Sequence, residues 1–137
     1  MARTMTRGAG AVLAVTLATM GVAGCAAEDS NEALDAYVEQ ERAVAASSPD
    51  IGEIYNDITI EPVYPAGVTV TYTYADPIDA GEASAYFDQL VGSFDQECAQ
   101  QVFPAMREFG VEGDLEAGFA FANPDGSMLW EYTCESA

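Results

Sequence analysis

The chain has 137 residues, half of them hydrophobic and one tenth aromatic, which is enough for one small folded domain. It carries 23 acidic residues against four basic ones, a charge that excludes nucleic acid and anionic lipid head groups as partners. It has neither histidine nor lysine, which excludes Ser-His-Asp and Cys-His catalysis, histidine-based zinc sites and Schiff-base chemistry.

The first 24 residues have the pattern of a bacterial lipoprotein signal peptide. Arg3 and Arg7 form a basic lead, the run that follows is uncharged, and Ala23-Gly24 precede Cys25. Small residues followed directly by cysteine are typical of a lipobox, where the signal is cut before the cysteine and the thiol receives a diacylglycerol. The alternative, a retained transmembrane anchor, needs about 20 apolar residues, which is more than this run supplies. We therefore expect lipidation of Cys25.

Cleavage before Cys25 leaves 113 residues, in which Arg42 and Arg107 face all 23 acidic residues, a net charge of −21. Residues 25–30 are expected to form a short lipid-anchored tether, and residues 31–137 a single domain. The domain is therefore expected at the extracytoplasmic face of the cell membrane, held there by the diacylglycerol on Cys25.

The first half of the domain is predicted to contain a helix and a β-hairpin. Asp29 or Ser30 caps a helix to about Ala46, whose apolar stripe is interrupted by Glu41. Residues 56–75 form the hairpin, and its second strand places alternate residues on opposite faces. Its apolar face carries Val68, Val70, Tyr72 and Tyr74, and its polar face carries Thr69, Thr71 and Thr73.

The second half repeats this order. Asp76-Pro77 and Asp79 predict the start of a long helix to about Phe109, kinked at Pro104 and capped by Gly110. A second hairpin follows, with its turn at residues 123–126. Its alternating inward residues are Leu115, Ala117, Phe119 and Phe121 before the turn, and Met128, Trp130, Tyr132 and Cys134 after it.

Two periodicities point to a disulfide. Cys98 lies on the apolar stripe of the long helix, and Cys134 shares its strand face with Trp130. Both cysteines are therefore aimed inward, in an exported compartment where disulfides persist. A reactive thiol pair is the alternative, but no neighbouring histidine or lysine lowers a thiol pKa. We predict a structural Cys98–Cys134 disulfide.

The order helix, hairpin, helix, hairpin predicts an α+β fold, in which a four-stranded antiparallel sheet carries two helices on one face. The face without helices is the expected docking surface, and its acidity favours a basic protein partner. The aromatic residues Tyr72, Tyr74, Trp130 and Tyr132 are expected in the core rather than in a ligand pocket.

We expect no cofactor, bound metal or catalytic residue. Two acidic groups have the oxygen ligands that calcium prefers, namely Asp76/Asp79/Glu82 and Glu112/Asp114/Glu116. The first is better explained as the start of a helix, and the second as the solvent face of a strand. The turn Asn123-Pro124-Asp125-Gly126 is likewise more typical of a tight hairpin than of a metal loop.

Three segments resemble a family of small Gram-positive, actinobacterial-type lipoproteins defined by a domain of unknown function. They are Ala33-Leu34-Asp35-Ala36-Tyr37, the run from Val68 to Tyr74, and Asn123-Pro124-Asp125-Gly126 leading to Leu129-Trp130. The resemblance implies a short helix, a Val-x-Tyr-x-Tyr strand, a central helix and an Asn-x-Asp-Gly hairpin. It implies no catalytic residue, and it favours a Gram-positive membrane face.

Together these observations predict a non-enzymatic, lipid-anchored module that binds another protein of the cell envelope. The alternative is a lipoprotein that binds a small solute or a divalent cation such as calcium. A hydrolase that uses paired carboxylates stands third, because 23 acidic residues bring some pair together by chance.

Overall fold

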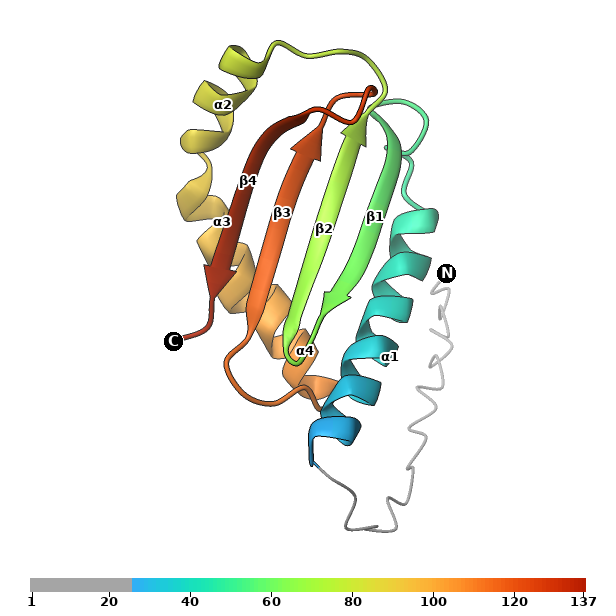
Figure 1. Ribbon diagram of the computed structural model, residues 1–137, viewed down its shortest axis with the longest axis vertical. Helices are drawn as coiled ribbons and strands as arrows, with labels where there is room; N and C mark the ends of the chain where they lie inside the picture. The colour runs from blue at the N-terminus through green and yellow to red at the C-terminus, as the bar shows by residue number, and fades with distance from the viewer. Residues whose placement is uncertain (1–25) are drawn as a thin grey trace, which may run out of the picture.

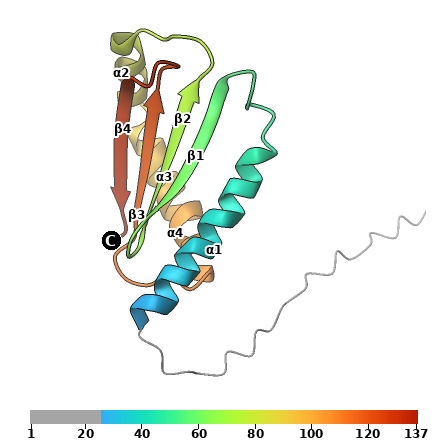
Figure 2. The same cartoon turned by 45° about the vertical axis from the view of Figure 1, so that its right-hand side comes forward.

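The computed structural model describes residues 26–137, so Cys25 and the predicted signal peptide lie outside the described residues. Four strands form one sheet in the order β1-β2-β3-β4, and the helices lie on one of its faces (Figures 1 and 2). The α+β class and the one-sided helices agree with the prediction. The elements are α1 (Ala26–Ala46), β1 (Tyr55–Val63), β2 (Gly67–Tyr74), α2 (Ala80–Asp88), α3 (Val91–Glu97), the π-helix η1 (Cys98–Val102), α4 (Phe103–Glu108), β3 (Glu116–Ala122) and β4 (Met128–Glu135).

The sheet is mixed, which corrects the expected antiparallel sheet. β1–β2 and β3–β4 are antiparallel hairpins, but β2 and β3 are parallel, with Gly67 opposite Glu116. The helices between them run back along the whole sheet, so β3 starts at the same end as β2 (Figure 1). A crossover of this length brings the chain back to the end of the sheet where β2 starts, so the next strand pairs with β2 in parallel. The order of the elements alone does not show this.

Helix α1 begins earlier than predicted. It starts at Ala26, so the expected tether forms its first turn, and it ends at Ala46 as predicted. Ser30 is only 8% exposed, and its hydroxyl oxygen accepts a hydrogen bond from the Glu112 backbone N–H at 3.4 Å. Packing against the rest of the domain therefore extends at least to Ser30. Within residues 26–137, no helix is both long enough and apolar enough to cross a membrane.

The predicted long second helix is divided into four segments. The Leu90 N–H donates to the Phe87 carbonyl, three residues back, and this tight turn separates α2 from α3. In η1 the Phe103 N–H donates to the carbonyl of Cys98, five residues back. Pro104 explains this widened turn, because proline has no N–H and its ring clashes with the carbonyl four residues earlier. The expected kink is therefore a π-helical turn just before the proline.

The strand faces follow the predicted alternation with one exception. In β4, Trp130 and Cys134 lie opposite Phe121 and Ala117 on the helical side. The register shifts at Ala122, which pairs with Met128, so Leu129 is an extra residue in this strand. As a result Met128, expected to face inward, is exposed, while Leu129 is buried.

Candidate functional site

The helical face of the sheet contains an open groove. Helix α1 meets α4 at one end of the molecule, and from there α1 follows β1 while η1, α3 and α2 lead towards β4 (Figure 1). The diverging helices leave a groove of about 300 Å³ above β1, β2 and β3. It is lined by Tyr37, Glu41, Val44 and Ala45 of α1, Ser48 and Asp50 of the following loop, Tyr55, Ile58 and Ile60 of β1, Val68, Val70 and Tyr72 of β2, Glu97 of α3, Val102 of η1, and Ala117 and Phe119 of β3.

The groove has an apolar floor because it lies over the inward positions of three strands. Val70 pairs with Phe119 across the parallel β2–β3 pair, and with Ile60 across the β1–β2 hairpin. Val70 is only partly buried, and Val44 on the α1 wall is 60% exposed. Apolar side chains of the sheet and of α1 are therefore left without an apolar contact in the groove.

Three carboxylates line the groove: Glu41 on α1, Glu97 at the end of α3, and the exposed Asp50 in the loop between α1 and β1. Glu41 and Glu97 stand on opposite walls. Burial raises the pKa of Glu41 above its usual value. Burial also raises the pKa of Tyr37, and the charges of Glu41 and Glu97 raise it further. The pKa of Tyr72 rises to about 12, first through burial and then through Glu97, with smaller contributions from Tyr55 and Glu41. Both carboxylates therefore act on the same two buried hydroxyl groups.

The nearest cation does not neutralise these charges. Arg42 follows Glu41 in α1, but its Nε donates to the Ile60 carbonyl at 2.8 Å and its Nη1 to Glu39 at 2.7 Å. The guanidinium thus caps a carbonyl of β1 and pairs with an exposed acid. No basic side chain lines the groove in the part of the chain that the structure describes.

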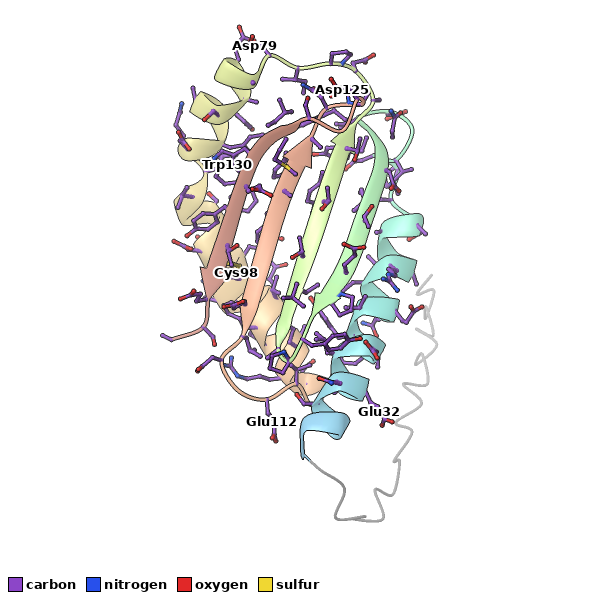
Figure 3. The ribbon with its side chains drawn as sticks, viewed as in Figure 1. Glu32, Asp79, Cys98, Glu112, Asp125 and Trp130 are labelled. Carbon is purple, nitrogen blue, oxygen red and sulfur yellow. A yellow bond between two sulfur atoms is a disulfide. The ribbon has the colours of Figure 1, made fainter. Side chains whose placement is uncertain are left out.

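The other half of the helical face is filled. Phe87 of α2 stacks on Phe121 with ring centroids 4.1 Å apart, and on Trp130 at 5.1 Å. The Trp130 indole N–H donates to Asp88 at 3.0 Å. A disulfide joins Cys98 of η1 to Cys134 of β4, in agreement with the prediction, and Figure 3 shows Cys98 and Trp130 along β4. The expected core role of Trp130 is confirmed, whereas Tyr72 also lines the groove.

The acidic groups considered for calcium have other places in the structure than a metal loop would require. The Asp79 carboxylate accepts the Glu82 N–H at 3.0 Å and caps α2, as expected of a helix start. Glu112 and Asp114 precede β3 instead of alternating along it, and Figure 3 shows Asp79 and Glu112 at opposite ends of the molecule. Within residues 26–137, no group of three or more acidic or cysteine side chains is placed to hold a metal ion.

The turn after β3 is a hairpin with a structural side-chain clamp. The Asn123 side chain accepts the Ile78 N–H at 2.8 Å and donates to the Ile78 carbonyl at 2.9 Å, which ties the turn to the loop before α2. Asp125 accepts two hydrogen bonds from Ser127, and these hold the Asp125 pKa below its usual range. Gly126 has φ of +87°, which explains the glycine at this position.

The face without helices, expected as the docking surface, is flat and polar. Thr71 lies between Thr59 and Ala120, and Thr69 lies opposite Gly118, whose other neighbour is Thr133. Its hollow at the Gly67 end measures about 160 Å³ and has mostly small and polar walls. This face offers less apolar surface to a partner than the groove does.

Sequence reasoning missed the groove, although one signal was present. Glu41 interrupts an otherwise apolar helical stripe, and in the structure this position lines the groove. Glu97 gave no such signal. The side of the helix on which Glu97 lies depends on the break between α2 and α3 and on the π-turn that follows it, and neither was predicted.

Comparison with known proteins gives a distant structural similarity. No family model matches the sequence, and no curated protein matches it either. The fold is similar to that of the pilotin EpsS from the type 2 secretion system of Vibrio vulnificus, with a TM-score of 0.46 and 15% sequence identity over 77% of this chain and 90% of that chain. At this level the similarity does not indicate a shared function.

Proposed function

We propose that the protein is a lipid-anchored, non-enzymatic module that binds another protein of the cell envelope, and that the groove between α1 and η1 receives a segment of that partner. The observation that carries the proposal is an apolar groove left open beside a densely packed core. The lipobox pattern at Cys25 supports anchorage at the extracytoplasmic face of the membrane, as in the small lipoproteins that the sequence resembles.

The groove is better suited to binding a segment of a protein than to catalysing a reaction. At about 300 Å³ it lies at the small end of ligand pockets, which span about 300–1,000 Å³, and it is partly open to solvent. Its polar groups are carboxylates, the Ser48 hydroxyl and tyrosine hydroxyls. Burial raises the pKa values of Tyr37 and Tyr72, so these two hydroxyls stay protonated at neutral pH. A nucleophile paired with a base is not among its lining residues.

The proposal is tested by filling the groove in cells. Ala45→Trp places an indole in the groove from α1, and Thr71→Trp adds the same bulk to the face without helices. Both variants and the unaltered protein are purified from membranes after cross-linking, and the attached proteins are quantified by mass spectrometry. We expect a dominant partner that is lost with Ala45→Trp and kept with Thr71→Trp. The reverse pattern would assign docking to the open sheet face, and loss with neither variant would contradict both assignments.

The anchor has a separate test. Cys25→Ala removes the thiol that receives the diacylglycerol, so metabolic labelling with a lipid precursor should fall to background and the signal peptide should stay uncleaved. Cys134→Ser, which leaves the lipobox intact, serves as the control and should keep the label. Persistent labelling of Cys25→Ala would contradict the assignment.

A further inference from the structure

Two carboxylates of the groove lack a compensating charge. Glu41 and Glu97 face the same space from opposite walls, and Arg42, which does not line the groove, is held by the Ile60 carbonyl and Glu39. Glu41 is partly buried beside apolar walls, so its carboxylate loses hydration and gains no compensating interaction while the groove is empty. Glu97 is exposed and adds a second negative charge at the opposite wall. An occupant with a positive charge supplies the missing interaction.

A metal ion does not fit this requirement. Calcium takes six to eight oxygen ligands, and the described residues contain no cluster of three or more side chains suited to a metal. The groove also presents apolar side chains such as Val44 and Val70, from which a metal ion gains no coordination. An organic cation on an apolar carrier, such as a lysine or arginine side chain of a peptide, matches both features.

The backbone N–H and C=O groups of the occupant also need hydrogen-bond partners. The groove lies over the inward side chains of β1, β2 and β3, above the face of the sheet, and at the edge strand β1 the carbonyl of Ile60 is already taken by Arg42. An extended peptide in the groove would leave its N–H and C=O groups without partners. A helix makes these hydrogen bonds internally and presents only side chains to the walls.

From charge complementarity and this backbone argument, we infer that the occupant of the groove is an amphipathic helix of the partner protein. Its apolar side chains contact Val44 and Val70, and a lysine or arginine on the same face lies between Glu41 and Glu97. This inference rests on the proposed function and adds the chemistry of the partner. Net charge alone attracts basic peptides to the whole molecule, so the specific claim concerns these two carboxylates.

The test is a selection from a displayed library of peptides of about 15 residues, long enough for a helix of several turns. The targets are the full-length protein in detergent, the double variant Glu41→Gln/Glu97→Gln, and a control with the same charge change at exposed sites, Glu32→Gln/Glu131→Gln. Selected peptides are expected to carry apolar residues at helical spacing and one basic residue. Their affinity should fall about tenfold with the groove variant, as expected for a desolvated charge pair, and stay within about twofold with the control.

Replacing the basic residue of a selected peptide by norleucine completes the test. We expect the same loss for the unaltered protein and no further loss for Glu41→Gln/Glu97→Gln, because both changes remove one interaction. Apolar helices without a basic residue that still bind in the groove would overturn this inference and leave the proposed function intact. If no selected peptide is sensitive to Ala45→Trp, both fail.

Discussion

The helices cover the two halves of one sheet face differently. Over β3 and β4, Phe87 lies between Phe121 and Trp130, and a disulfide fastens η1 to β4. Over β1 and β2, the inward residues Ile58 and Val70 face a groove. Both halves have inward apolar side chains, so the difference lies in what covers them. The filled half holds the fold together, and the open half leaves apolar surface for a partner.

The largest expected effect is on the filled half. Phe87→Ala removes a buried ring that stacks on Phe121 and Trp130, and we expect the free energy of unfolding to fall by about 3–5 kcal/mol. Val70→Ala is the matched change on the groove floor and should cost about 1 kcal/mol or less, because this side chain is already partly exposed. Urea denaturation followed by circular dichroism measures both. Equal losses would contradict the distinction between the halves.

The disulfide comes next. The double variant Cys98→Ala/Cys134→Ala opens a link that spans 36 residues, and it should lower the free energy of unfolding by about 2–4 kcal/mol. Thiol titration of the denatured, unreduced protein checks the link independently. Two free thiols at these positions would show that the bridge does not form.

Alkaline pH tests the buried hydroxyl groups of the groove. An unfolded tyrosine loses its proton near pH 10, but burial raises the pKa of Tyr72 to about 12. The folded state therefore holds the proton longer, and this contribution to stability is complete below pH 10 and is lost as the pH rises to 12. Tyr72→Phe should remove about 2 kcal/mol of the decline between these values, measured by denaturant titration at each pH. An unchanged slope would mean that the Tyr72 hydroxyl is accessible to water.

The smallest and most telling effect concerns Glu41. Burial raises the pKa of Glu41, so its contribution to stability is complete below pH 4.5 and falls as the pH rises through the folded value. Glu41→Gln should therefore raise the melting temperature slightly at pH 7, while peptide binding weakens. Glu39→Gln, which loses only the exposed pair with Arg42, should leave both nearly unchanged. A destabilised Glu41→Gln variant would assign Glu41 a structural role.

Much of the fold follows from local patterns in the sequence. The faces of β2, the cap at Asp79, the turn at Asn123 and the Cys98–Cys134 link each depend on short-range periodicity or turn chemistry. The parallel pairing of β2 with β3 was not predicted from these patterns, because it depends on how far the crossover helices extend along the sheet. The break at Leu90 has no proline or glycine at the residue itself to mark it, and the extra residue Leu129 is fixed by pairing across strands.

The groove was beyond sequence reasoning for a related reason. It exists because α1 and η1 diverge over the sheet, and the angle between two helices depends on packing along their whole length. The sequence marked Glu41 as an exception on an apolar stripe but left its counterpart Glu97 unmarked. Site residues that lie on separate elements become visible only when the elements are assembled.

The most direct test of the groove as a docking site is photo-cross-linking in intact cells. A benzophenone amino acid replaces Val44, which is exposed on the groove wall, or Thr133, which is exposed on the face without helices. We predict a single strong cross-linked protein from position 44 that disappears when Ala45→Trp fills the groove, and only background from position 133. A product from position 133 with none from position 44 would contradict the account.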